Sequence, residues 1–119
     1  MKLVAGVDEV GRGSLIGPVY AAAVILNKSI NKKDLKDSKS LNKNKREKLF
    51  TYIKKNSTWA IGQASVKEIE KINILHASLL AMKRAIIKLK KKPTLVLIDG
   101  NKLPNLKNYN LRYIIKGDQ

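Results

Sequence analysis

The chain contains no cysteine, so disulfide bonds and thiolate metal sites are both excluded. It has a single histidine, His76, which has no second histidine or cysteine with which to share a metal, and we expect it to be a packing or surface residue. No apolar run is long enough for a signal peptide or a membrane span. These absences predict a soluble cytoplasmic protein with no membrane partner.

Negative charge is also scarce, because 9 Asp and Glu residues stand against 25 Lys and Arg residues. The resulting formal charge of +16 would attract a polyanion such as nucleic acid more readily than an acidic small molecule. The alternative is a basic surface that only keeps the protein soluble. A length of 119 residues, of which 44% are apolar, predicts one domain over residues 1–119.

Five apolar segments have the composition of β-strands, at residues 3–8, 18–26, 58–66, 94–98 and 111–115. A loop of mostly small residues suggests that the first two pair antiparallel. The fully apolar fourth segment is typical of a central parallel strand reached through a helical crossover.

Two helices are expected between these strands, one over residues 42–55 and one that begins at a cap on Asn73 and stops before Pro93. Residues 67–71 should form a short helical turn, and residues 27–41 a polar loop. The order of elements predicts an α/β fold.

Carboxylates follow three of the expected strands: Asp8 and Glu9 after the first, Asp99 after the fourth and Asp118 after the fifth. If these strands are parallel neighbours, their carboxyl ends lie along one edge and the four acids converge. Like charges at close range are costly unless hard divalent cations with oxygen ligands neutralise them. On a basic protein, this pattern suggests a two-metal phosphodiester site. For an isolated Asp-Glu pair, the alternative is a strand end with solvated acids.

Adjacent acids in a strand point to opposite faces of a sheet, so that Asp8 and Glu9 share one site only if the strand ends or bulges between them. Gly11 and Gly13 follow closely and make such a distortion cheap.

An ordered set of motifs resembles the type 2 ribonuclease H family (ribonuclease HII). Each motif alone is weak, but the set runs in family order from end to end of the chain. The motifs are Gly6-Val7-Asp8-Glu9-Val10-Gly11-Arg12-Gly13 with Gly17-Pro18-Val19, Asp37-Ser38-Lys39, Asn73-Ile74-Leu75-His76-Ala77, Leu97-Ile98-Asp99-Gly100-Asn101 and Lys116-Gly117-Asp118.

The resemblance implies catalytic roles for the four acids, which match family positions that bind magnesium or manganese. It further implies that Gly11-Arg12-Gly13 forms the loop that senses the ribose 2′-hydroxyl at the junction between a ribonucleotide and the following DNA. Ser38 and Lys39 match residues near the site and are candidate phosphate contacts.

The implied fold is the ribonuclease H-like fold, a mixed five-stranded sheet flanked by helices. The implied activity is hydrolysis of the RNA strand of RNA–DNA hybrids and cleavage at ribonucleotides embedded in a DNA duplex, by two-metal-ion catalysis. The complete protein is expected to be a monomer.

The chain stops one residue after Asp118, where family members continue into further helices and a tyrosine that stacks at the hybrid junction. We therefore expect a form that is truncated relative to the family, and one alternative is a catalytically weak or inactive nucleic-acid-binding module. A nucleotide-binding α/β domain is a second alternative, but Ile16 occupies the third glycine position of the dinucleotide fingerprint.

Overall fold

A computed structural model describes residues 3–12, 17–26 and 57–115 of the 119-residue chain. Two expected elements, the loop over residues 27–41 and the helix over residues 42–55, lie outside the described residues. The described elements are β1 (Val4–Arg12), β2 (Val19–Leu26), β3 (Ser57–Ala64), α3 (Val66–Lys88), β4 (Leu95–Asp99) and β5 (Leu111–Ile114).

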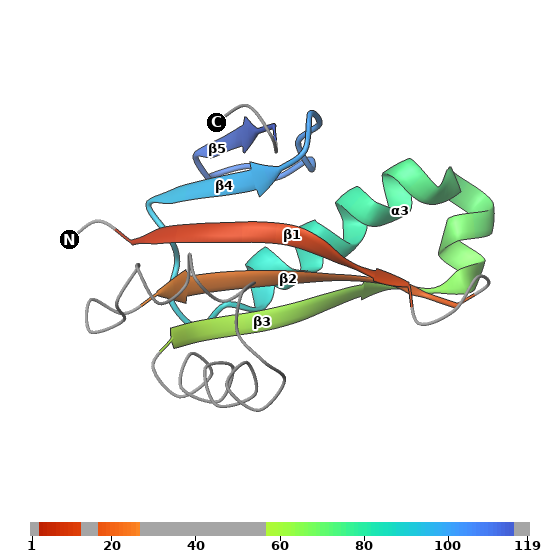
Figure 1. Ribbon diagram of the computed structural model, residues 1–119, viewed down its shortest axis with the longest axis horizontal. Coiled ribbons are helices and arrows are strands. Elements are labelled where there is room, and N and C mark those ends of the chain that lie inside the picture. Colours follow the sequence, from red (N-terminus) through yellow and green to blue (C-terminus); the bar gives the residue numbers. More distant parts are fainter. Residues whose placement is uncertain (1–2, 13–16, 27–56, 116–119) are drawn as a thin grey trace, which may run out of the picture.

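The strands form one five-stranded sheet in the order β3-β2-β1-β4-β5 (Figure 1). β2 pairs antiparallel with both β1 and β3, whereas β4 pairs parallel with both β1 and β5. The expected mixed sheet, its antiparallel first pair and its central parallel strand are therefore confirmed.

The first strand is longer than expected, and the prediction that it ends at Asp8 was wrong. β1 continues to Arg12, and its register with β2 shifts between Glu9, which faces Ala21, and Gly11, which faces Tyr20. One extra residue in β1 is accommodated as a bulge, and the ladder then resumes. Gly11 has φ +110°, a conformation that a residue with a Cβ rarely adopts. The bulge thus lets the strand continue past the acids.

α3 begins earlier than expected and contains a break at Asn73. Ser65 caps its first turn in a capping box, in which the Ser65 Oγ accepts a hydrogen bond from the Glu68 N–H and the Glu68 carboxylate accepts one from the Ser65 N–H. Asn73 has φ 66°, and its Oδ1 accepts a hydrogen bond of 3.1 Å from the His76 N–H. The predicted cap at Asn73 is confirmed, but residues 67–71 belong to the same bent element, whose turn is visible in Figure 1.

The first turn of α3 is tied to its later half by an ion pair between Glu68 and Arg84. Two contacts join the groups, Nη1 to Oε1 at 2.7 Å and Nη2 to Oε2 at 2.6 Å, and Arg84 also donates to the carbonyl of Gln63 at the end of β3. The Arg84 guanidinium, with help from the Ser65 backbone, lowers the pKa of Glu68 to about 2. This pair therefore links the two arms of the bent helix.

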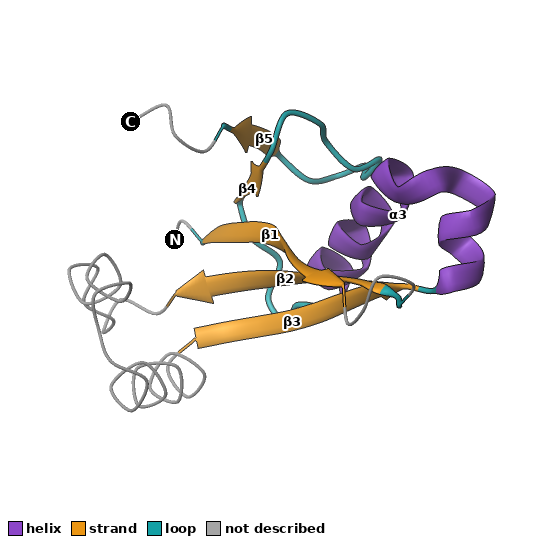
Figure 2. Ribbon diagram, turned by 45° about the vertical axis from the view of Figure 1, so that its right-hand side comes forward, coloured by secondary structure: helices purple, strands orange, loops and turns teal. Residues whose placement is uncertain are grey.

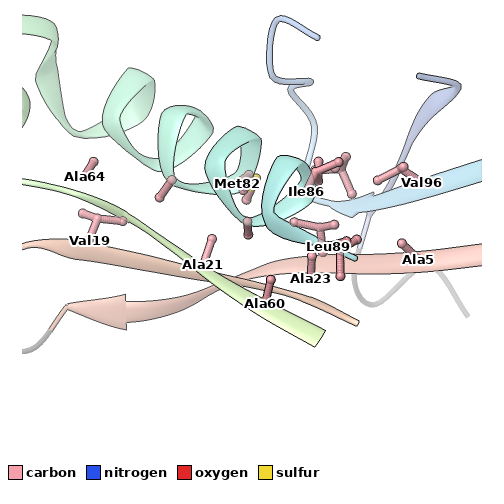
Figure 3. Packing of buried hydrophobic residues seen from close by; sticks show 14 of the residues in the cluster. Ala5, Val19, Ala21, Ala23, Ala60, Ala64, Met82, Ile86, Leu89 and Val96 are labelled. Carbon is pink, nitrogen blue, oxygen red and sulfur yellow. The ribbon is translucent and has the colours of Figure 1, made fainter. Parts of the chain in front are cut away.

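α3 covers one face of the sheet, with the hydrophobic core between them (Figures 2 and 3). Half of the sixteen buried apolar residues in the described part of the chain are alanines, among them Ala21, Ala23, Ala60 and Ala64 from the sheet and Ala77, Ala81 and Ala85 from the helix. Gly62 of β3 lies so close to α3 that a Cβ built on it would be 2.0 Å from the Ala81 carbonyl oxygen. Small side chains therefore bring the helix unusually near to the strands.

Candidate functional site

Asp8 and Asp99 lie side by side on neighbouring parallel strands. The register of β1 with β4 pairs Val7 with Ile98, and the two aspartates are the next residues in each strand. The register is fixed at the other end of the strands by Thr94, whose N–H donates to the Leu3 carbonyl at 2.8 Å and whose hydroxyl accepts from the Leu3 N–H at 3.0 Å. The expectation that these two acids meet at one edge agrees with this register.

The two aspartates also share a face of the sheet. Val7 and Ile98 are buried on the face covered by α3, and alternation along each strand turns the following residue to the opposite face. Asp8 and Asp99 are accordingly only partly buried. A pair of carboxylates is thus presented on the side of the sheet away from α3.

Glu9 takes the other face, because β1 runs regularly through Asp8 and Glu9 and bulges only after them. Its side chain is exposed and its Oε1 accepts a hydrogen bond from the hydroxyl of Ser78 on α3. A bulge between Asp8 and Glu9 would have turned both side chains to one face. The observed bulge lies one position later, between Glu9 and Gly11, so the two side chains stay on opposite faces. Ser78 was not identified from the sequence, since a serine within a helix carries no signal of a partner 69 residues away.

The expected substrate loop Gly11-Arg12-Gly13 lies partly in a strand. Gly11 and Arg12 belong to β1 and pair with Tyr20 and Val19 of β2, which corrects the expectation of a loop at these two positions. The positive φ of Gly11 agrees with its predicted role in relieving strain there. Three other predicted residues of the substrate site, Gly13, Ser38 and Lys39, lie outside the described residues.

The donor set fits a hard divalent cation in its chemistry, because carboxylate oxygens are the ligands that such ions prefer. Within residues 3–12, 17–26 and 57–115, however, no group of three or more His, Cys, Asp or Glu side chains is close enough to hold a metal. Asp118 lies outside these ranges, so the convergence of all four acids stays a prediction.

His76 is exposed on α3 and lines an open groove between the helix and the segment after β4, together with Ile72, Leu79, Leu80, Lys83, Leu103 and Asn105. Of the two placements expected for His76, packing or surface, the structure has the surface one. In the part of the chain that the structure describes, no helix combines the length and apolar character needed to span a membrane.

Comparison with known proteins finds a match to the family model of ribonuclease HII over residues 5–119. Ribonuclease HII of Pelagibacter ubique (strain HTCC1062) is 83% identical over 119 residues, which is 100% of this chain and 64% of that protein. This chain therefore spans just under two thirds of that relative.

Solved structures show the same fold. The crystal structure of ribonuclease H2 from Pyrococcus horikoshii OT3 aligns with a TM-score of 0.69 and 25% identity, over 95% of this chain and 61% of that chain. Bst-RNase HIII in complex with Mn²⁺ aligns with a TM-score of 0.63 and 23% identity, over 85% of this chain and 37% of that chain. The ribonuclease H-like fold expected from the motifs is confirmed.

Proposed function

This chain belongs to the ribonuclease HII family, and from that premise we propose that the protein is an endoribonuclease acting on RNA–DNA hybrids and on ribonucleotides embedded in DNA. We further propose that residues 1–119 form a single catalytic domain. The observation that carries the proposal is the placement of Asp8 beside Asp99, on one face, at the carboxyl ends of adjacent parallel strands. Parallel strand ends are where α/β proteins build their sites.

Four carboxylates would hold the catalytic cations: Asp8, Glu9, Asp99 and Asp118. Two bound Mg²⁺ or Mn²⁺ ions would supply the charge stabilisation that phosphodiester hydrolysis needs. Asp8 and Asp99 would bind from the open face of the sheet, and Glu9 would approach from the side of α3. Because Asp8, Glu9 and Asp99 lie on hydrogen-bonded strands, their backbones are fixed before any cation binds, which favours precise placement.

Substrate binding would rest on charge and on the β1 bulge. A formal charge of +16 supports attraction of a phosphate backbone, and the attraction should weaken as salt rises. Gly11 and Gly13 would let the main chain approach a sugar, and the 2′-hydroxyl is the group that separates RNA from DNA. Arg12, Ser38 and Lys39 are proposed as further substrate contacts.

The decisive test replaces Asp99 with Asn in the full natural length of the protein. A duplex that contains one ribonucleotide is incubated with Mg²⁺ or Mn²⁺, and the cleavage rate and the affinity for the duplex are measured separately. We expect cleavage to fall by at least about 100-fold, since even outer partners of a metal ligand are worth 10–100-fold. Binding should persist, because it depends on phosphate contacts.

Glu70→Gln is the matched control, because Glu70 is an exposed acid on α3 and its loss changes the net charge by the same amount. This variant should cleave at the wild-type rate. Near-normal cleavage by a folded Asp99→Asn protein would overturn the site. A wild-type protein that binds the duplex but does not cleave it would favour the alternative, a non-hydrolytic nucleic-acid-binding module.

A further inference from the structure

We propose that Ser78 is a positioning residue, which holds the carboxylate of Glu9 in place for the catalytic cation. The inference rests on the proposed function, in which Glu9 is one of the metal-binding acids. It adds a residue from the helical layer to a site that is otherwise built on the ends of strands.

The first support is the contact itself. The Ser78 hydroxyl donates to Oε1 of Glu9 and so links α3 to β1 across 69 residues of sequence. Glu9 is exposed, and a long flexible side chain at an exposed position samples several rotamers unless a partner selects one. A carboxylate has two oxygens, so a hydroxyl that binds one of them leaves the group able to offer the other to a cation.

The second support is the way the helix delivers Ser78. The break at Asn73 ends the first arm of α3, and the capping bond from the His76 N–H to Asn73 Oδ1 starts the second arm one turn before Ser78. Ala77, the preceding residue, is fully buried against the sheet. The second arm of α3 therefore runs close to the sheet, and a side chain as short as that of serine can reach Glu9.

The third support is the known effect of such contacts, because a hydroxyl bound to one oxygen of a metal-binding carboxylate limits the orientations that the carboxylate can take. Residues that orient a metal ligand typically change metal affinity or activity by 10–100-fold when they are removed. The expected effect of losing Ser78 lies in this range.

The test compares Ser78→Ala and Ser78→Thr, each made in the wild-type protein and in a Glu9→Gln background. Mn²⁺ affinity is measured by calorimetry without substrate, and cleavage is measured as a function of Mg²⁺ concentration. We expect Ser78→Ala to weaken Mn²⁺ binding about 10-fold and to raise the Mg²⁺ requirement, whereas Ser78→Thr, which keeps the hydroxyl, should restore both. Thermal melting shows whether a variant is folded. Ser78→Ala is not expected to destabilise α3, because alanine has a higher helix propensity than serine.

The Glu9→Gln background shows whether Ser78 acts through Glu9. In that background Ser78→Ala should cause no further loss of Mn²⁺ affinity. Wild-type Mn²⁺ affinity in Ser78→Ala, or an equal loss in both backgrounds, would overturn the positioning role while leaving the nuclease assignment intact. A wild-type protein that neither binds Mn²⁺ nor cleaves would instead overturn the proposed function itself.

Discussion

Replacing Gly62 with alanine should push α3 away from the sheet and destabilise the protein. Gly62 lies in β3 where the helix crosses it, and a Cβ at this position would be 2.0 Å from the carbonyl oxygen of Ala81 and 2.4 Å from the nitrogen of Ala85. Both obstacles are backbone atoms of α3, so no side chain can rotate away to make room. The whole helix, or the whole strand, has to move.

The size of the effect follows from that displacement. Real Cβ atoms essentially never come closer than 3.0 Å to a heavy atom, so the gap must widen by about 1 Å. A radial gap of 0.5–1 Å forfeits roughly a quarter to a half of the dispersion energy of each contact. Overpacked core variants lose about 1–3 kcal/mol, and a clash with backbone belongs at the upper end of that range. A loss of about 3 kcal/mol lowers the melting temperature by roughly 12 °C in a chain of this length.

Circular dichroism melts and urea unfolding measure the loss, with Gly6→Ala as the matched control. Gly6 is also a strand glycine, but a Cβ on it meets no heavy atom within 4 Å, so this variant should be as stable as the wild type or slightly more stable. If Gly62→Ala melts within about 2 °C of the wild type, the close approach of α3 to β3 is not the constraint we infer.

Two other changes test the bulge and the ion pair. Gly11→Ala should lower the free energy of unfolding by about 1–3 kcal/mol, because φ +110° strains any residue with a Cβ. The rate of cleavage at the junction should fall by more than this loss of stability explains. A variant that unfolds yet keeps its specific activity would show that the bulge is only structural. Glu68 has a folded-state pKa of about 2, below an unfolded value of about 4.3, so the stability it contributes is present above pH 4.3 and is lost as pH falls toward 2. Urea unfolding of wild type and Glu68→Gln should therefore converge over that pH range, and a constant difference down to pH 2 would contradict the ion pair's role.

The strands could be predicted because their apolar pattern is local, whereas the true end of β1 depends on its partner. The acids at positions 8 and 9 suggested a strand end, yet pairing with β2 carries the strand on to Arg12. The position of a bulge depends on how two strands pair. The sequence of β1 alone shows only a glycine that can adopt the conformation a bulge requires. Gly11 was therefore recognised as a distortion, but the distortion was expected between Asp8 and Glu9 rather than after them.

The start of α3 shows how two correct signals compete. Asn73 does cap a helical arm, as its position before an apolar stripe predicted. Ser65 and Glu68, spaced as a capping box, mark an earlier start that the sequence also carries. The sequence-based prediction used only the Asn73 cap, whereas the structure uses both and forms one helix with a bend at Asn73.

One part of the site could be predicted from local sequence and another part could not. Asp8 and Asp99 each follow an apolar strand, and once those strands are parallel neighbours their meeting is a consequence of register. The contact of Ser78 with Glu9 depends instead on where α3 crosses β1, which is set by the bend at Asn73 and by the thickness of the alanine-rich interface. The position of α3 over β1 depends on many small residues that are far apart in the sequence, and none of them belongs to a recognisable motif.

Three of the candidate acids, Asp8, Glu9 and Asp99, are therefore positioned by two different layers of the fold. Asp8 and Asp99 are set side by side by the register of β1 with β4, a pairing in which α3 takes no part. Glu9 also depends on the distance between helix and sheet, because its partner Ser78 lies on α3. A hydrogen bond weakens steeply outside its normal range of length and angle, so a helix displaced by about 1 Å would lose its hold on Glu9 while leaving the aspartate pair intact. The small residues at the interface, Gly62 among them, thus contribute to the geometry of the site as well as to the stability of the core.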